Sequence, residues 1–328
     1  MKWKPLRLLG LAMLASFFVT SCVSMNVKLV EDFTDPLKET TIEGEGANKV
    51  LVIPINGFIS DQTKDGMMKK KPSLVKEVVS QIRKAESDPA VKAVVLKVNS
   101  PGGTVTSSHI LYNEINKLKL KRRIPLVVSM MDITTSGGYY LSLPADHIIA
   151  HQTTITGSVG VVFMRPKFQG MMDKIGVSIE TNKSGKNKDM GSPFRATTNQ
   201  ETRSFQAITD ELADLFEDKV AKHRKVSKSA LREIMTAKIY TANQALKLGM
   251  IDQIGFTDDA INKARSMAGL DSNSRVIMYR RVQFADDNIY NNLTARSGSG
   301  TPLVDLGPLS AISDVKAGFY YTWPAATK

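Results

Sequence analysis

The sequence predicts an α/β protein in which helices cover a largely parallel β-sheet. Short apolar runs alternate with segments of helical spacing, which is the pattern of βαβ units. One run, residues 91–98, is rich in valine and apolar almost throughout, as a strand buried on both faces would be. The chain of 328 residues is 42% hydrophobic and 23% charged. This composition supplies a large core and excludes a disordered, collagen-like or disulfide-stapled protein.

The predicted elements follow one another from residue 49 onward. We expect strands over 49–55, 91–98, 124–130 and 147–150, with helices over 74–85 and 109–120 between them. A longer helix is expected over 199–225. It carries an apolar stripe that packs on the sheet or on a neighbouring subunit, formed by Phe205, Ile208, Leu212, Leu215, Phe216 and Val220. Two shorter helices near 227–235 and 241–248 follow, and Gly249 is expected to end the second.

The first residues have the organisation of a secretory signal peptide. Lys2, Lys4 and Arg7 precede an uncharged, mostly apolar run over 8–19. As a helix this run would be about 18 Å long, which is too short for a bilayer core of about 30 Å. It ends in Val-Thr-Ser-Cys, which resembles a bacterial lipobox, where the cysteine is diacylated and becomes the first residue. We therefore expect a lipoprotein signal over 1–21 and an extracytoplasmic protein of the bacterial cell envelope, anchored to a membrane through Cys22. An ordinary signal peptide with a chance cysteine is the alternative.

The composition limits the binding partners and the kinds of covalent or metal site that we expect. Lys and Arg outnumber Asp and Glu by 44 to 32, and the net charge of +12 favours an anionic membrane surface. We expect no nucleic-acid partner, because export removes it and no basic motif interleaved with aromatic residues is present. Cys22 is the one cysteine of the sequence, so neither an internal disulfide nor a cysteine-based metal site is expected. We divide the chain after the signal into a lipid-anchored linker over 22–47, one folded domain over 48–271, and an extension over 272–328 whose structure the sequence does not define.

Three glycine-containing turns follow predicted strands and are the candidates for chemistry. Residues 99–103 read Asn-Ser-Pro-Gly-Gly, and paired glycines allow consecutive backbone N–H groups to face an oxyanion. Residues 134–140 read Thr-Thr-Ser-Gly-Gly-Tyr-Tyr and place Ser136 at the start of a helix, where a serine is either a nucleophile or an N-cap. Residues 156–160 read Thr-Gly-Ser-Val-Gly and form a third turn of small residues. Taken singly, each turn is explained at least as well by an ordinary structural role.

A serine nucleophile requires a general base, and the sequence offers two kinds of candidate, histidine and lysine. Each histidine is a weak candidate, because a single histidine is more often structural; they are His109, His147, His151 and His223. Lysine is the other kind, since a lysine that loses its charge through burial accepts a proton from serine. Three lysines stand in one short segment and are equally explained as charges of a solvated loop: Lys183, Lys186 and Lys188.

Four motifs together point to one family. They are Ser-Pro-Gly-Gly at 100–103, Thr-Ser-Gly-Gly-Tyr-Tyr at 135–140, Thr-Gly-Ser-Val-Gly-Val at 156–161 and Lys-Ser-Gly-x-x-Lys-Asp at 183–189. In this order and spacing the sequence resembles the signal peptide peptidase SppA (protease IV) family of the S49 serine peptidases, which has a ClpP/crotonase-like fold. The likeness extends from about residue 49 to residue 268. Each motif is weak singly, but the four together are highly specific.

The resemblance implies a Ser–Lys dyad, without a cofactor or a metal ion. The serine of the second motif is Ser136, the nucleophile, and the second lysine of the fourth motif is Lys188, the general base. The small hydroxyl residue of the third motif, Ser158, would orient the lysine. Backbone N–H groups would form the oxyanion hole, at Gly102, Gly103 and Gly137.

The same resemblance implies an assembly and a substrate class. Each motif occurs once, so the chain is expected to be a half-size, single-domain member with its S49 peptidase domain over 48–271. Its serine and lysine would then come from adjacent protomers of a homo-oligomeric ring. The expected substrates are cleaved signal peptides or other hydrophobic peptides at the membrane.

Three other functions fit parts of the sequence. A crotonase would bind acyl-CoA, which an exported protein does not meet. A Ser-His-Asp peptidase on a ClpP-like fold would use His151, which follows Ser136 by only fifteen residues and leaves the lysine motif without a role. A catalytically inactive, membrane-tethered oligomeric scaffold of the same fold would keep its function after Ser136→Ala.

Overall fold

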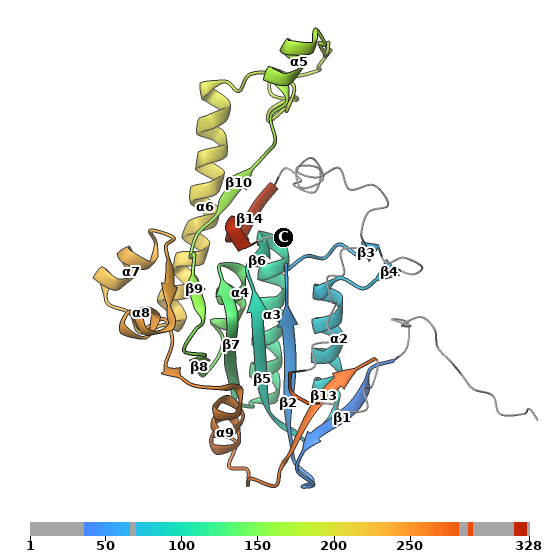
Figure 1. The fold of residues 1–328 in the computed structure, drawn as a ribbon, viewed down its shortest axis with the longest axis vertical. Helices are drawn as coiled ribbons and strands as arrows, with labels where there is room; N and C mark the ends of the chain where they lie inside the picture. Colours follow the sequence, from blue (N-terminus) through green and yellow to red (C-terminus); the bar gives the residue numbers. More distant parts are fainter. Residues whose placement is uncertain (1–35, 66–69, 282–287, 291–317, 327–328) are drawn as a thin grey trace, which may run out of the picture.

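A nine-stranded, mostly parallel sheet forms the centre of the molecule (Figure 1). The computed structural model describes residues 36–65, 70–281, 288–290 and 318–326. Within them the strand order is β1-β13-β2-β5-β7-β8-β12, while β9 pairs with β7 and β11 pairs with β9. The pairs from β13 to β12 are parallel, and β1 and β11 are antiparallel to their neighbours. The α/β prediction is confirmed.

The strands of this sheet include every strand expected from the sequence. They are β1 (Lys38–Glu43), β2 (Lys49–Asn56), β5 (Val91–Ser100), β7 (Leu126–Thr135), β8 (His147–Ala150), β9 (Ile155–Gly157), β11 (Ile239–Thr241), β12 (Gln253–Ile254) and β13 (Arg275–Arg280). A separate short hairpin is formed by β3 (Lys64–Asp65) and β4 (Lys70–Lys71).

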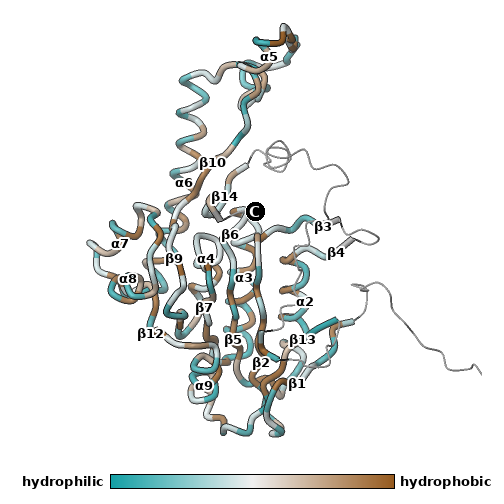
Figure 2. The backbone as a smooth tube through the Cα atoms, viewed as in Figure 1, coloured by the Kyte–Doolittle hydropathy of each residue, from teal (hydrophilic) through white to brown (hydrophobic). Residues whose placement is uncertain are grey.

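Helices cover both faces of the sheet, as the apolar strands require. One face carries α2 (Leu74–Ser87), α3 (Val105–Arg122) and α4 (Gly137–Ser142), and the other carries α9 (Thr257–Met267). Strand β2 shows how alternation divides the core. Leu51 and Ile53 belong to the larger apolar cluster on the α2 and α3 side, whereas Val50 and Val52 belong to the smaller cluster with α9. The central strands are accordingly hydrophobic along most of their length (Figure 2).

Two segments that we expected outside the folded domain belong to the sheet. Residues 38–43, expected in the linker, form β1, and residues 275–280, expected in the undefined extension, form β13 between β1 and β2. Strand β13 is almost fully buried, with Val276 and Ile277 each 0% exposed. A strand of this kind is stabilised by partners far away in the chain, so local periodicity does not reveal it. The predicted signal peptide and Cys22 lie outside the described residues.

A long projection extends from one end of the sheet (Figure 1). The chain leaves through β10 (Val162–Met164), passes α5 (Gln169–Ile175) near the tip, and returns along α6 (Asn199–His223). In the lower part of α6, Phe216 and Val220 are fully buried against the body. Ile208 and Leu215 of the same predicted stripe are 38% and 47% exposed. The stripe therefore packs on the body only in part.

The remaining elements lie beside the edge strands β9, β11 and β12 or form a second, smaller sheet. Helices α7 (Lys228–Ile234) and α8 (Ala242–Lys247) lie where the sequence predicts them, and Gly249, with a φ of +74°, follows the end of α8. A second sheet has the order β10-β14-β6, where β6 is Gly102–Thr104 and β14 is Gly318–Thr322, followed by the short 3₁₀ helix η1 (Pro324–Ala326). Among the helices of the described segments, none has the length and apolar character that a membrane span requires.

Candidate active site

Ser136 stands at the junction between β7 and α4, at the carboxyl end of a central parallel strand. Its backbone has φ 51° and ψ −115°, a left-handed conformation that a residue with a side chain adopts only under strain. Its N–H donates to the Gly157 carbonyl at 2.7 Å, and its own carbonyl accepts the first bond of α4 from the Tyr140 N–H at 2.8 Å. Hydrogen bonds on both sides of the residue thus hold the strained conformation in place.

The Ser136 hydroxyl does not cap the helix that it precedes. The side chain makes no cap hydrogen bond, and Oγ is buried without a hydrogen-bond partner in the described part of the chain. A buried hydroxyl without a partner is unfavourable by about 1–3 kcal/mol, so proteins rarely retain one without a use. Ser136 is thus the N-cap residue of α4 by position, but its side chain does not make the capping bond that the N-cap interpretation requires.

The paired glycines of the first motif lie beside Ser136. Gly102 and Gly103 form β6, and Gly102 has a φ of +100° that favours glycine. A Cβ on Gly102 would lie 2.8 Å from the Gly137 nitrogen, which follows Ser136 directly. One edge of β6 is bonded to Ile59. The Ile59 N–H donates to the Gly102 carbonyl, and the Thr104 N–H donates to the Ile59 carbonyl. Alternation along the strand turns the Gly103 N–H to the other edge, where β14 pairs with β6 and Tyr321 lies opposite Gly103.

The first N–H groups of α4 have no partner within that helix, because no turn precedes them. The Gly137 N–H is therefore a second donor beside the edge of β6 at Gly103. Two backbone donors next to a buried serine are the parts of an oxyanion hole. We predicted Gly102, Gly103 and Gly137 for this role, and the structure brings all three together around one end of β7.

The third motif forms the next turn along the same edge. Ser158 has φ 52°, is 9% exposed, and donates its N–H to the Lys238 carbonyl at 2.7 Å. The preceding Gly157 accepts the Ser136 N–H and leaves no room for a side chain, since a Cβ would lie 2.6 Å from the Lys238 carbonyl oxygen. This turn therefore positions the backbone of Ser136 and places a second small hydroxyl nearby.

None of the histidines is bonded to Ser136, whose Oγ has no hydrogen-bond partner among the described residues. Two of them contact tyrosines: His109 bonds Tyr140 at 2.8 Å and His223 bonds Tyr112 at 2.7 Å. Burial, aided by neighbouring lysines, lowers the pKa of His223 to about 4. The other two bond elsewhere, with His147 on Gln253 and His151 on Thr153. Among the described residues, therefore, Ser136 has no histidine partner.

The lysine motif lies on the projection, away from the sheet. Lys188 is exposed in the segment between α5 and α6, and it makes no hydrogen bond to Ser136 within the described chain. Its N–H donates to the Gly185 carbonyl at 3.0 Å, which closes a tight turn. The structure of a single chain therefore does not bring Ser136 and Lys188 together.

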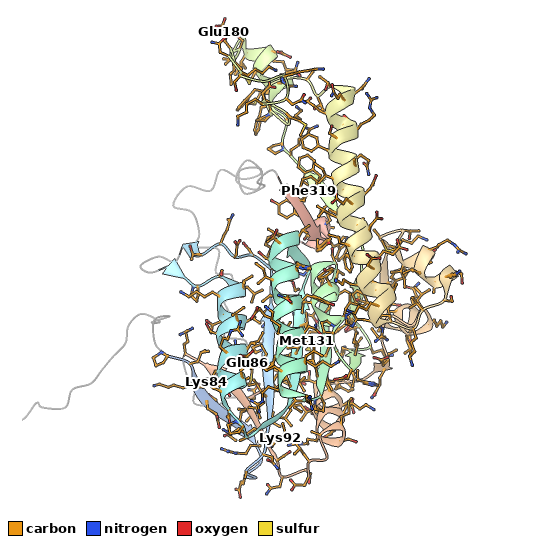
Figure 3. All side chains as sticks on the ribbon, turned by 180° about the vertical axis from the view of Figure 1, so that it is seen from behind. Lys84, Glu86, Lys92, Met131, Glu180 and Phe319 are labelled. Carbon is orange, nitrogen blue, oxygen red and sulfur yellow. The ribbon has the colours of Figure 1, made fainter. Side chains whose placement is uncertain are left out.

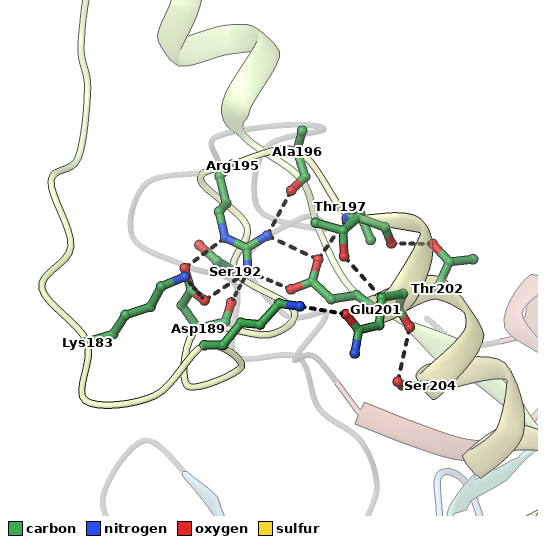
Figure 4. A network of polar contacts seen from close by, with 12 residues as sticks. Lys183, Asp189, Ser192, Arg195, Ala196, Thr197, Glu201, Thr202 and Ser204 are labelled. Atoms are coloured by element: carbon green, nitrogen blue, oxygen red, sulfur yellow. Dashed lines mark hydrogen bonds and ion pairs between the residues drawn. The ribbon is translucent and has the colours of Figure 1, made fainter.

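An ion-pair network holds the segment that carries Lys188 (Figure 4). Arg195 donates to both oxygens of Asp189, from Nε at 2.8 Å and from an Nη at 2.9 Å, and it also bonds Glu201 at the start of α6. Lys183 reaches the same Asp189 at 2.8 Å. The Arg195 guanidinium and then the Lys183 ammonium hold the pKa of the Asp189 carboxyl well below its usual range. Hydrogen bonds from Arg195 likewise lower the pKa of Glu201 to about 2.

Sequence reasoning missed two parts of the site. The first is β14, which lies in the extension that the sequence left undefined and pairs with β6, the strand of Gly102 and Gly103. The second is Arg195, whose guanidinium donates to Asp189, six residues before it, and to Glu201, six residues after it. The spacing of one arginine between two acids was visible in the sequence. Because such pairs are usually solvent-exposed and weak, the pattern alone carried no signal.

A buried serine that has no hydrogen-bond partner among the described residues, beside backbone N–H groups at the end of a parallel strand, is an arrangement that serine hydrolases use. The family model for Peptidase family S49 matches residues 118–271. A protein of Enterococcus faecium that carries the name signal peptide peptidase SppA is 35% identical over 263 residues, which is 80% of this chain and 76% of that protein. The chain belongs to peptidase family S49 and is a serine peptidase.

Two further relatives support this assignment. A protein of Methanocaldococcus jannaschii named as a protease is 36% identical over 66% of this chain and 68% of its own length. Protease 4 of Haemophilus influenzae is 31% identical over 79% of this chain, but the match covers only 41% of that longer protein. The recognised family and the fold class are thus confirmed.

Proposed function

We propose that the protein is a membrane-associated endopeptidase that uses Ser136 as its nucleophile and Lys188 as its general base. The observation that carries this proposal is Ser136 itself: its backbone is strained, its buried hydroxyl has no partner among the described residues, and the Gly137 N–H follows it directly. Strain of this kind is retained where a reaction uses it.

The chemistry follows from these positions. Lys188 in its neutral form accepts the proton of Ser136, and the oxygen attacks a peptide carbonyl whose developing charge is stabilised by the N–H groups of Gly103 and Gly137. The carbon–nitrogen bond breaks, and the lysine returns the proton to the leaving amine. Water, activated by the same lysine, then hydrolyses the acyl-serine. Ser158 lies close enough to the Ser136 turn to orient the lysine.

The two halves of the dyad are proposed to come from different protomers. Lys188 is exposed in one chain, whereas a lysine base has to be buried to lose its charge at neutral pH. The projection that carries it also exposes large apolar side chains, which a neighbouring copy would cover: Met171, Ile175, Val177, Ile179 and Phe194. A contact from the projection of one protomer to the body of the next is head-to-tail, and such contacts form a ring when the rotation from one protomer to the next closes.

The proposed location and substrates rest on the sequence. Acylation of Cys22 would anchor the chain to a membrane of the bacterial envelope, where cleaved signal peptides and other hydrophobic peptides are available. This part is tested by growth with labelled palmitate. We expect label in the wild-type chain and none in Cys22→Ser, which also leaves the membrane fraction; label retained in Cys22→Ser would contradict the anchor.

The dyad is tested by complementation. Neither Ser136→Ala nor Lys188→Ala of the 23–328 chain should hydrolyse a hydrophobic reporter peptide. When the two variants are dissociated, mixed in equal amounts and reassembled, about a quarter of the wild-type activity should return, because one site in four receives an intact serine and an intact lysine. Lys186→Ala, which changes a neighbouring lysine of the same loop, serves as the matched control and should stay active.

Each other outcome has a defined meaning. Activity of Lys188→Ala by itself would remove the lysine from the mechanism. A mixture that stays inactive while each variant still forms the oligomer would place both groups in one protomer. If the wild-type assembly cleaves no peptide and Ser136→Ala keeps the biological function, the chain acts instead as an oligomeric scaffold.

A further inference from the structure

Residues with a strained backbone are connected to Ser136 by backbone hydrogen bonds. In the described part of the chain, four residues other than glycine have a positive φ: Arg123, Ser136, Ser158 and Ala237. Arg123 is the C-cap of α3, where a left-handed residue is common. The other three lie in segments that are bonded to one another. Strain persists where the surrounding structure holds it, and strained residues gather at functional sites.

Two backbone hydrogen bonds make this connection. The Ser136 N–H donates to the Gly157 carbonyl at 2.7 Å, and the following residue, Ser158, donates its N–H to the Lys238 carbonyl at 2.7 Å. Ala237, with a φ of 58°, directly precedes Lys238. The segment around Ala237 therefore supports the Ser158 turn, residues 156–160, and the Ser158 turn supports the strained backbone of Ser136.

The segment that contains Ala237 is attached to the body on both sides. Before it, α7 ends at Ile234, whose side chain is fully buried and whose carbonyl accepts the Ala237 N–H at 3.1 Å. After it, β11 pairs antiparallel with β9, with Ile239 opposite Gly157. These contacts give the intervening Lys238 carbonyl a defined position against the Ser158 turn.

The Ala237 methyl contacts the same turn. A Cβ built on Gly160 would lie 2.9 Å from the Ala237 Cβ, so position 160 has no room for a side chain while Ala237 keeps its place. The backbone of Gly160 lies outside the left-handed region and does not itself require glycine. Ala237 is exposed and belongs to neither apolar core cluster of the described residues. The methyl thus meets the Ser158 turn without serving the core.

Ala237 lies on the serine side of the proposed dyad. Helix α7 and strand β11 stand beside the body, far from the tip of the projection near Glu180 (Figures 1 and 3). Lys188 belongs to that projection, between α5 and α6. A change at Ala237 therefore reaches Ser136 through the Ser158 turn, and it leaves the lysine loop of the same chain unchanged.

We propose that Ala237 is a positioning residue, which holds the Ser158 turn and through it the Ser136 hydroxyl. This inference rests on the proposed function and adds to it a residue that lies outside the four motifs. A lysine that enters from a neighbouring protomer meets both serine hydroxyls only when the two turns keep their separation. A displacement of about 1 Å between reacting groups lowers a rate by up to about a hundredfold.

A size swap between positions 160 and 237 tests the contact. In the 23–328 chain, Gly160→Ala places a second methyl against Ala237, so kcat for a hydrophobic reporter peptide should fall at least about tenfold with little change in KM. Ala237→Gly removes the original methyl and should lower kcat about fivefold. The double variant again has one methyl between the turns, so its kcat should return to within about twofold of wild type.

Stability distinguishes positioning from a structural role. Ala237→Gly should not lower the urea midpoint, because relief of the left-handed strain offsets the entropy that glycine gives to the unfolded chain. Two control variants should keep the wild-type kcat. Gly170→Ala has nothing within 4 Å of its new methyl, and Thr236→Ala changes a neighbouring side chain of the same segment.

Amide hydrogen exchange reports the connection without catalysis. In Ala237→Gly the N–H groups of Ser158 and Ser136 should exchange about tenfold faster than in the wild type, because the segment that holds them has loosened. The His151 N–H, which donates to the Met130 carbonyl at 3.0 Å, is the internal reference and should keep its rate.

The outcomes separate this inference from the proposed function. Full activity of Gly160→Ala, or a double variant no better than Gly160→Ala, would overturn the inference and leave the peptidase proposal intact. A loss of kcat in Ala237→Gly that is matched by a lower urea midpoint would also overturn it. If the wild-type chain hydrolyses no peptide, the proposed function is refuted; faster exchange at both serines would then still support the connection, and unchanged exchange would overturn both.

Discussion

Arg195 donates hydrogen bonds from two nitrogens to the carboxylate of Asp189, and Asp189 directly follows Lys188. The same arginine bonds Glu201, which forms a capping box with Thr198 at the start of α6. The loop that carries the proposed base is therefore fastened to the first turn of a 25-residue helix. These bonds connect the loop to α6 at several atoms, although its residues lie near solvent.

This relationship predicts a positioning role for Asp189. Asp189→Asn keeps the size of the side chain but loses the charge that holds Arg195, so we expect kcat for a reporter peptide to fall about tenfold with little change in KM. Steady-state kinetics at several pH values provide the measurement. Gln200→Ala, which removes the Lys186 partner in the same segment, is the control; an equal loss in both variants would contradict a specific role of the Arg195 fork.

The strain at Ser136 predicts a gain of stability upon loss of function. Ser136→Gly should raise the free energy of unfolding by about 1–3 kcal/mol, because glycine adopts φ 51° without strain. Ser136→Ala keeps the strained backbone and removes only the unpaired hydroxyl, so its gain should be smaller. Urea denaturation of the two inactive variants measures the difference. A glycine variant that is less stable than the alanine variant would contradict the strain.

Gly102 is predicted to tolerate no side chain. In Gly102→Ala the new methyl would lie 2.0 Å from the Tyr321 carbonyl oxygen, in a backbone conformation with φ +100°. We expect peptidase activity to fall at least about a hundredfold, as after loss of an oxyanion-hole donor. Gly170→Ala is the control, because nothing lies within 4 Å of its Cβ position. Retained activity of Gly102→Ala would remove β6 from the oxyanion hole.

The low pKa of His223 predicts that the free energy of unfolding decreases as the pH falls. Burial, reinforced by Lys222 and Lys119, lowers this pKa from 6.5 to about 4, so the unfolded chain binds more protons than the folded chain between these pH values. Stability contributed by neutral His223 is therefore complete above pH 6.5 and is lost as the pH falls toward 4. Since the side chain is partly exposed, we expect about 1–2 kcal/mol over this window.

The variant His223→Gln isolates this contribution. It should be less stable than the wild type at pH 7, because the contact with the Tyr112 hydroxyl changes, but it should lose less stability between pH 6.5 and 4. His151→Gln, at a histidine that bonds Thr153 and not Tyr112, is the control and should follow the wild-type curve. Thermal or urea unfolding at four pH values measures the slopes, and parallel curves for His223→Gln and wild type would contradict the assignment.

Elements with their own periodicity were predictable from the sequence. The apolar runs at residues 49–55 and 91–98 predicted β2 and β5, because a strand buried on both faces is apolar almost throughout. The amphipathic pattern after Asn199 predicted α6, because a helix that buries one stripe leaves its period in the sequence. The glycine motifs around Ser136 were equally visible. Their residue types serve backbone conformations, and those requirements are local.

Elements defined by distant partners were not predictable. Strand β1 consists of Lys-Glu-Thr-Thr-Ile-Glu and pairs with β13, whose residues follow more than two hundred positions later. Strand β14 lies in the extension that the sequence left undefined, and nothing near it in sequence indicated Gly102 and Gly103 as the pairing strand. Strand pairing depends on which edges remain open after the rest of the chain has packed.

By itself, the sequence determined the α/β class, the order of the four motifs and the residues Ser136 and Lys188 as candidates. These features depend on residue type and spacing, which a single chain records. Only the tertiary structure decided that the Ser136 backbone is strained and that its buried hydroxyl has no partner in the part of the chain that the structure describes. It also decided that Lys188 lies exposed on a projection and that Tyr321 contacts Gly102. Those relationships depend on distances between segments far apart in the chain, and such distances are fixed only when the sheet and its helices pack together.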